Sequence, residues 1–384
     1  MSSPKALEQP LGLKLTSAAF LLFWIVIAAF PLFWILVMSF KLPVDAFDSN
    51  PLNVIGGPDT LSNGYGLSIL DIVGGIGVLF AAYKIATGYV SKLVPHVSIA
   101  GQTWLGWILA VLIFAIGFVI SFFFILPGIL SVLNLIPVLG TPILGATTQH
   151  YVAVWVENEF YRNFMNSLIV TVGVVVISLT VGTLAGYGLA RSGSNLAFWL
   201  LILALIFRAL PHSVLVTGYL PVFINSAEIL RPIFGEGAPT LYGQPLAVIF
   251  VLVSINQPFT IWMLRSFFQN IPTELDEAAR VDGCSHFEAF RRVIMPVMWP
   301  GVITTGLFSF LLAYNDYLVT ALLLDAQNMT MVPAITQYFN RETTTTDQIE
   351  AIAAAVSITA PLFILVMVFQ RQIVSGLTAG AVKG

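Results

Sequence analysis

Long apolar stretches alternate with short polar connections along most of this 384-residue chain. A bilayer core about 30 Å thick is crossed by a helix of about 20 apolar residues. Two of the candidate stretches are weaker, since one holds Asp71 and Lys84 and the other runs into several prolines. The stretches predict up to eight membrane spans, at residues 17–39, 67–90, 105–127, 164–190, 196–220, 245–268, 299–324 and 352–370.

The composition agrees with the class of membrane proteins. Hydrophobic residues make up 58% of the chain and charged residues only 9%, whereas soluble domains carry about 25% charged residues. The first apolar stretch is longer than the core of a signal peptide, so we expect an uncleaved first span. The single cysteine, Cys284, excludes an intrachain disulfide framework. Without a basic run, no nucleic-acid partner is expected.

The distribution of basic residues predicts the orientation in the membrane, because Lys and Arg concentrate in cytoplasmic loops. With the N-terminus inside and all eight stretches spanning, eleven of the 16 Lys and Arg residues lie inside and four outside. This predicts cytoplasmic N- and C-termini and a cytoplasmic polar loop at 269–299. Segments 67–90 and 105–127 must then both cross or both not cross, which allows eight or six spans.

The polar loop 269–299 predicts two short helices joined by a turn. Thr273, followed three residues later by Asp276, has the pattern of a helix N-cap. Gly283 is placed to end the first helix in a left-handed conformation. Small apolar residues on this helix would leave a flat patch for a partner; they are Leu275, Ala278 and Ala279.

The second helix of the loop has its own start and stop signals. Ser285 followed by Glu288 predicts a capping box. Pro296 is expected to end this helix, because proline lacks the backbone donor that a helix interior needs.

Residues 277–296 as a whole resemble the "EAA" signature of permease subunits in binding-protein-dependent ABC importers. The signature reads E-A-A, three residues, G, nine residues, I-x-L-P, and Val293 and Met295 here replace its usual Ile and Leu. In that family this loop carries the coupling helix, which docks on a separate ATPase subunit. The resemblance therefore assigns an ATPase-coupling role to Glu277, Ala278, Ala279, Arg280, Asp282, Gly283 and Pro296.

Further segments are similar to maltose-type sugar permeases. The resemblance covers the first span and residues from about 161 to the C-terminus. The matching elements are 163–168 (N-F-M-N-S-L), 185–191 (A-G-Y-G-L-A-R), 257–265 (Q-P-F-T-I-W-M-L-R), 314–317 (Y-N-D-Y) and the tail 376–384.

The resemblance implies an all-α polytopic membrane protein with the type I permease fold of ABC importers. Six core transmembrane helices are expected, with two further spans in an N-terminal insertion. The expected regions are 1–40 (first transmembrane helix), 41–160 (inserted segment) and 161–384 (core permease domain). A long insertion of this kind resembles the α-glucoside branch, whose cargo includes sucrose, trehalose and maltose.

The resemblance also implies the partners. We expect a permease subunit in the bacterial inner membrane, surrounded by lipid, with a second homologous permease, two ATPase subunits and an extracytoplasmic sugar-binding protein. The chain lacks the G-x-x-x-x-G-K-[ST] loop that cradles ATP phosphates. ATP and Mg are therefore expected on the partner ATPase, and no catalytic residue, cofactor or metal site is expected in this chain.

Ionisable residues inside membrane spans are functional candidates by default, because burying them in hydrocarbon is costly. The candidate translocation path consists of Arg208, Asn256, Gln257, Tyr314, Asn315, Asp316 and Tyr317. In the structural alternative, Arg208 reaches the membrane interface and Asp316 pairs with a neighbouring helix. Two functional alternatives stay open: a self-contained secondary transporter or channel, and an ABC permease for a non-sugar solute.

Overall fold

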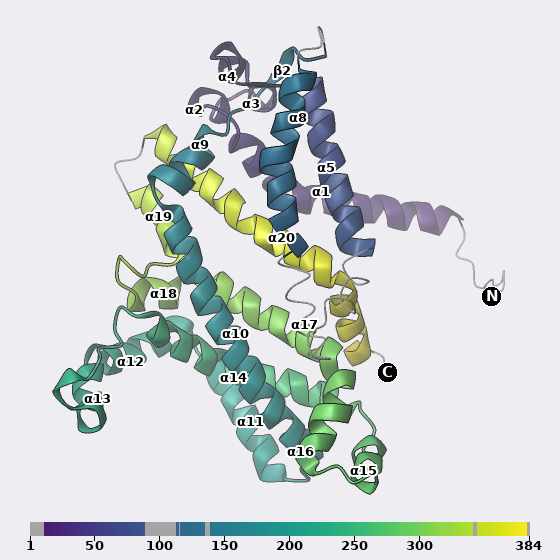
Figure 1. The fold of residues 1–384 in the computed structure, drawn as a ribbon, viewed down its shortest axis with the longest axis vertical. Coiled ribbons are helices and arrows are strands. Elements are labelled where there is room, and N and C mark those ends of the chain that lie inside the picture. Colours follow the sequence, from purple (N-terminus) through teal and green to yellow (C-terminus); the bar gives the residue numbers. More distant parts are fainter. Residues whose placement is uncertain (1–10, 89–112, 115, 135–138, 341–343, 382–384) are drawn as a thin grey trace. The chain divides into compact units, whose positions relative to one another are not determined.

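The computed structural model describes residues 11–88, 113–114, 116–134, 139–340 and 344–381. These residues fall into two compact units, which Figure 1 shows as ribbons. The first unit takes its residues from Met1–Phe80, Phe118–Asn158 and Tyr338–Ala360. The second unit takes them from Ala81–Gly117, Glu159–Gln337 and Pro361–Gly384.

The first unit begins with a long apolar helix and continues through short elements. Its elements are α1 (Leu11–Met38), α2 (Pro43–Ala46), α3 (Pro51–Gly56), α4 (Pro58–Ser62), β1 (Gly66–Ser68), most of α5 (Ile69–Gly88), η2 (Ser121–Ile125), α8 (Leu126–Leu133), β2 (Pro142–Gly145), α9 (Gln149–Val152) and η3 (Ala153–Glu157). The strands β1 and β2 pair antiparallel, with Leu67 opposite Leu144. This small sheet is an addition to an otherwise helical fold that the sequence did not predict.

A buried polar cluster holds the inserted segment together directly after α1. The ammonium group of Lys41 is buried and donates hydrogen bonds to the carbonyl oxygens of Ile55 and Gly145. The carboxylate of Asp45 accepts three hydrogen bonds from the first residues of α4. A ring nitrogen of His150 lies 3.0 Å from the carbonyl oxygen of Lys41. Because buried polar groups need such partners, the cluster fixes the path of this segment.

The second unit consists of helices, several of them broken. They are α10 (Phe160–Arg191), α11 (Asn195–Arg208), α12 (His212–Ile224), α13 (Ser226–Phe234), η4 (Gly235–Gly237), α14 (Pro245–Gln269), α15 (Glu274–Val281), α16 (His286–Ala289), η5 (Phe290–Ile294), α17 (Met295–Tyr314), α18 (Leu318–Leu323) and most of α19 (Met331–Asn340). The last helix, α20 (Thr345–Ala381), contributes residues to both units.

Five helical stretches of the described residues are long and apolar enough to cross a membrane. They are Gly12–Met38, Phe160–Arg191, Pro245–Gln269, His286–Tyr314 and Thr345–Gln370. A sixth span results if α11 and α12, which are bent by 96° at their junction, count as one. The prediction of an all-α polytopic membrane protein is therefore confirmed, with five spans, or six if the bent pair is counted. Segment 67–90 contains α5, but residues 105–112 and 115 of segment 105–127 lie outside the described residues, so the choice between six and eight spans stays a prediction.

Two of the predicted spans differ from the structure in detail. The span expected at 196–220 is interrupted between Arg208 and His212, where Pro211 cannot donate the backbone hydrogen bond of a continuous helix. The span expected at 299–324 is shifted, since the helical stretch begins at His286 and ends at Tyr314. Asp316 therefore lies in the break before α18 and not inside a continuous span.

Small residues allow α10 and α14 to pack closely. Ser178, Gly182 and Gly186 are buried on one face of α10 at intervals of four residues. A Cβ atom at Gly182 would lie only 2.6 Å from the side chain of Thr260 on α14. Stripes of small residues with this spacing are typical of contacts between membrane helices. The close packing brings the C-terminal ends of α10 and α14 together.

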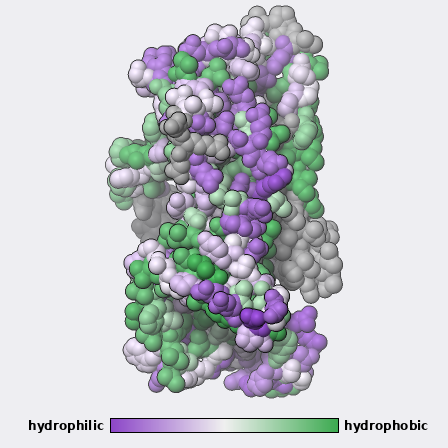
Figure 2. Space-filling model, turned by 90° about the vertical axis from the view of Figure 1, so that its left-hand side faces the viewer, coloured by the Kyte–Doolittle hydropathy of each residue, from purple (hydrophilic) through white to green (hydrophobic). Residues whose placement is uncertain are grey.

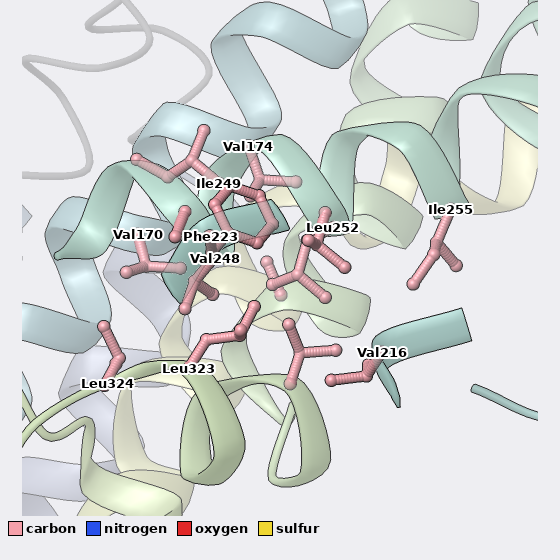
Figure 3. Close-up of a cluster of buried hydrophobic side chains, with 14 residues drawn as sticks. Val170, Val174, Val216, Phe223, Val248, Ile249, Leu252, Ile255, Leu323 and Leu324 are labelled. Carbon is pink, nitrogen blue, oxygen red and sulfur yellow. The ribbon is translucent and has the colours of Figure 1, made fainter. Parts of the chain in front are cut away.

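A hydrophobic core joins the broken helices to this pair. In Figure 3 the side chains of α10, α12, α14 and α18 converge on one cluster. Its labelled members are Val170, Val174, Val216, Phe223, Val248, Ile249, Leu252, Ile255, Leu323 and Leu324.

Large apolar side chains also remain on the surface of the helices. Trp199, for example, is 65% exposed and Ile169 is 52% exposed. The face drawn in Figure 2 shows hydrophobic residues in contiguous areas beside hydrophilic ones. A soluble monomer rarely exposes so much apolar surface, whereas a membrane-spanning helix presents it to lipid.

Candidate functional site

The polar loop after α14 has the two-helix form that the sequence predicts. Helix α15 leads into Gly283, whose φ of 89° lies in the left-handed region. Ser285 then caps α16, since its hydroxyl accepts from the amide of Glu288 and the Glu288 carboxylate accepts from the amide of Ser285 at 3.0 Å. The turn at Gly283 and the capping box at Ser285 are both confirmed.

Two other predictions for the loop are wrong. Thr273 is the N-cap residue of α15, but its side chain makes no capping hydrogen bond. Pro296 does not end a helix, because the helical stretch continues from His286 to Tyr314. The π-helical turn η5 comes immediately before α17, and the amide of Met295 donates to the carbonyl of Phe290 across it. Pro296 is the second residue of α17 and lies at its junction with this π-helical turn.

The Asp276 side chain is bound by two residues from the C-terminal end of α10. The hydroxyl of Tyr187 donates to Oδ1 of Asp276 at 2.7 Å. The Nε and Nη2 atoms of Arg191 each lie 2.7 Å from Oδ2 of the same carboxylate. Tyr187 and Arg191 are one helical turn apart and therefore present their side chains on the same face of α10.

The same guanidinium also reaches the end of α14. Nη1 of Arg191 donates to the carbonyl oxygens of Ile271 at 3.2 Å and Phe268 at 3.4 Å. Carbonyl groups at the C-terminal end of a helix have no partner within the helix, and a cation stabilises them. Arg191 thus connects three elements, α10, the end of α14 and α15. We call Tyr187, Arg191 and Asp276 the α10–α15 clamp.

An apolar cluster lies beneath the clamp. Its buried members come from α14, η5 and α17, together with Ile271, which follows α14. The ring of Tyr187 packs on Phe268 and Phe290, at 5.5 and 4.8 Å between ring centroids. The clamp therefore lies beside a packed core, and the side chains of Arg191 and Asp276 are only 18% and 12% exposed.

Several other side chains of α15 are exposed. Val281 is 88% exposed, and Glu277, Ala278, Arg280 and Asp282 are also exposed. Phe287, in α16, adds an apolar side chain that is 64% exposed. The sequence did not lead us to Val281 or Phe287, although a large apolar residue in a charged loop can indicate a contact with a partner protein. We call Glu277, Ala278, Arg280, Val281 and Phe287 the loop surface.

Ala279 does not belong to the apolar patch that the sequence predicts. It is only 5% exposed and faces the body of the unit, because it lies three residues after Asp276 on the bound face of α15. Ala278 and Leu275, which is 37% exposed, remain on the accessible side.

A pocket of about 300 Å³ opens between the ends of α10, α15 and α16. It is lined by Tyr187, Arg191, Thr273, Asp276, Glu277, Arg280, His286 and Ala289. Acidic and basic groups both line it, so the hollow suits a polar side chain better than an apolar one.

The residues of the candidate translocation path on α11 and α14 have defined contacts. The guanidinium of Arg208, at the end of α11, lies 4.6 Å from the ring centre of Phe259. Asn256 is buried, and its amide donates to the hydroxyl of Ser309 at 2.7 Å. The amide of Gln257 donates to the carbonyl of Ser178 on α10 at 3.3 Å.

The remaining path residues surround the break between α17 and α18. Tyr314 is buried and stacks on Phe310, whereas Tyr317 is 47% exposed. Asn315 donates back to Leu311, and the Asp316 carboxylate accepts from the amide of Thr320 at the start of α18. Arg208 and Asp316 form no ion pair within the described residues. The role of all seven residues in transport stays a prediction.

Taken together, the fold and the loop define a polytopic membrane protein with a polar, structured helix held between two spans. Residues 178–378 match the model of the family described as binding-protein-dependent transport system inner membrane component. That match covers more than half of the chain, and the chain belongs to this family. The inserted segment lies before the matched region.

Relatives with related names align over the same part of the chain. The chain is 34% identical to the diacetylchitobiose uptake system permease protein of Streptomyces coelicolor, over 62% of this chain and 81% of that protein. It is 31% identical to the trehalose transport system permease protein of Mycobacterium tuberculosis, over 62% and 82%. It is 32% identical to the sulfoquinovosyl glycerol transport system permease protein of Agrobacterium fabrum, over 62% and 79%.

Proposed function

We propose that this chain is one of two permease subunits of an ABC importer for carbohydrates, with an α-glucoside as its cargo. The observation that carries the proposal is the loop surface on α15 and α16. A charged helix between two membrane spans, held by the Asp276 contacts and carrying an 88% exposed Val281, fits a site for a partner protein. Membership of the transport family supports the ATPase of an importer as this partner.

The proposed assembly contains a second homologous permease, two ATPase subunits with ATP and Mg, and an extracytoplasmic sugar-binding protein. The loop surface lies in the cytoplasm, together with both chain termini, as the excess of Lys and Arg on that side favours. ATP binding closes the ATPase dimer, the loop moves with it, and the permease pair turns outward to receive sugar from the binding protein. ATP hydrolysis on the ATPase supplies the energy, and this chain forms part of the path of the sugar through the membrane.

The carbohydrate cargo is supported by relatives that are named for glycosides. The α-glucoside itself rests on the long inserted segment, which resembles that branch, and on the trehalose relative. Relatives named for diacetylchitobiose and sulfoquinovosyl glycerol show that related chains serve other glycosides.

The test is purification of the tagged chain in mild detergent, followed by mass spectrometry and a cargo screen. The proposal expects an ATPase with a Walker loop and a second permease to co-purify. The associated binding protein is expected to bind maltose, trehalose or sucrose in calorimetry, and cellobiose serves as the β-linked control. A chain that purifies alone and still moves solute in liposomes would contradict the importer, and preference for cellobiose would contradict the α-glucoside.

A further inference from the structure

We infer that the α10–α15 clamp transmits the movement of the loop to the membrane helices, with Asp276 as the positioning residue. The inference rests on the proposed function, since it assigns the step that follows docking of the ATPase. Glu277 and its exposed neighbours would meet the partner, and the buried Asp276 would carry the resulting displacement into α10.

The geometry of the contacts supports this division of roles. Asp276 uses both carboxylate oxygens toward α10, through the three contacts of 2.7 Å from Tyr187 and Arg191. Charge-assisted contacts of this length are stronger than neutral hydrogen bonds and fix direction as well as distance. Glu277, the next residue along α15, is exposed and lines the pocket beside the clamp. Of the two adjacent carboxylates, Asp276 is thus bound to α10, whereas Glu277 is accessible to a partner.

The length of α10 determines how far such a displacement reaches. The clamp holds the last turn of a helix that runs from Phe160 to Arg191. Ser178 and Gly182 pack this helix closely on α14, and Arg191 also binds the carbonyls at the end of α14. A push on α15 therefore displaces α10 and α14 together. Besides the clamp, α15 is tied to the second unit by the buried Ala279 and by the chain on either side of it.

Because Arg191 and Asp276 are largely buried, each charged group needs the other as its partner. Removing one partner of a buried ion pair leaves the other charged group without compensation, whereas removing both is far better tolerated. Asp276→Asn alone and Arg191→Gln alone should each disturb the α15 position. The double variant Arg191→Gln with Asp276→Asn should recover part of the loss, because its two neutral amides can still hydrogen-bond.

The first test measures whether α15 and α10 move as one body. Spin labels on Cys284, the only cysteine, and on an introduced Gly188→Cys report the distance between the loop and the exposed side of α10. Distances are compared in the complete transporter, nucleotide-free and after vanadate trapping. The inference expects one unchanged distance with the clamp intact and a shifted or broader one with Asp276→Asn. A distance that changes between the two states with the clamp intact would overturn it.

The second test measures coupling as the ratio of sugar taken up to ATP hydrolysed in proteoliposomes, with radiolabelled trehalose as the probe. Asp276→Asn and Arg191→Gln are each expected to lower the ratio at least tenfold, and the double variant to recover at least threefold. Tyr187→Phe removes a single hydroxyl, folds without a buried charge left over, and is expected to lower the ratio at least threefold. A ratio unchanged in Tyr187→Phe and Asp276→Asn would overturn the inference.

The control is Arg162→Gln at the opposite end of α10. Arg162 also pairs with a carboxylate, Glu159, at 3.0 Å, but both side chains are about half exposed or more. The coupling ratio should not change. Whether the purified variants retain the ATPase distinguishes a failure of the proposed function from a failure of the clamp. A wild-type chain that never binds an ATPase contradicts the proposed function, whereas an assembled variant with a normal ratio contradicts only the clamp.

Discussion

The close packing of α10 on α14 can be tested with two identical substitutions six residues apart. Gly182 is buried against α14, and Gly188, on the same helix, has no atom of another element within 4 Å of where its Cβ would lie. Replacing either glycine by alanine gains about 1 kcal/mol of helix propensity. Only at Gly182 does the new methyl group meet an obstacle.

The magnitude follows from the contact that the methyl group would make. A Cβ atom at Gly182 would be 2.6 Å from Cγ2 of Thr260 and 3.2 Å from Leu264. Thr260 is fully buried and its hydroxyl donates to the carbonyl of Asn256, so this side chain has little room to move. Overpacking of this kind costs about 1–3 kcal/mol. Gly182→Ala should therefore be about 1–3 kcal/mol less stable than Gly188→Ala.

The assay is unfolding of the purified chain by increasing SDS in mixed micelles, followed by Trp fluorescence. The comparison of the two variants cancels the shared gain in helix propensity, so their difference reports the contact alone. Equal free energies of unfolding, within about 0.3 kcal/mol, would refute the close approach of α10 and α14. Such a result would also remove the basis for joint movement of the two helices.

Further predictions concern three residues, Gly283 and Ser285 in the loop and His150 in the inserted segment. Gly283→Ala should lower the free energy of unfolding by about 1–2 kcal/mol, because φ is 89° and an L side chain is strained there. The added Cβ meets no neighbouring atom, so backbone strain alone sets this cost. Gly283→Pro should uncouple ATP hydrolysis from uptake in proteoliposomes. Ser285→Ala should lower the free energy of unfolding by about 0.5–2 kcal/mol through loss of the capping box, measured in the same SDS titration. Burial lowers the pKa of His150 below its usual value, so stability contributed by the neutral ring is present above about pH 6.5 and is lost as the pH falls below it. Thermal unfolding at pH 7.5 and 5.5 should show this loss in the wild type and less of it in His150→Gln, whose amide does not titrate.

Much of the fold could be predicted because membrane spans leave a strong sequence signal. Apolar length alone located the core spans, and the capping residues located α16 and the turn at Gly283. The errors occur where a rule based on a few neighbouring residues was overridden by the structure around them. Pro296 was read as a helix end, but a π-helical turn before it lets the helix continue. The breaks beside Arg208 and Asp316 were hidden inside continuous apolar stretches.

The clamp shows what the sequence could indicate but not establish. Tyr187 and Arg191 were noticed as part of a resembling motif, and their spacing places them on one face of a helix. Asp276 was assigned to helix capping, because a local hydrogen bond is the simplest use of an acidic residue in the first turn. Its actual partners lie 85 and 89 residues away in the chain. No local pattern specifies a contact over that separation.

The central claim is that the loop surface binds an ATPase, and a photo-crosslink from Val281 tests it most directly. A benzophenone side chain introduced at this 88% exposed position should join the chain to a Walker-loop ATPase in intact membranes. The same probe at Ile233, which is 76% exposed on α13, should not. The account predicts the ATPase adduct from Val281 alone. An ATPase adduct from Ile233, or none from Val281 in an assembled and active transporter, would contradict it.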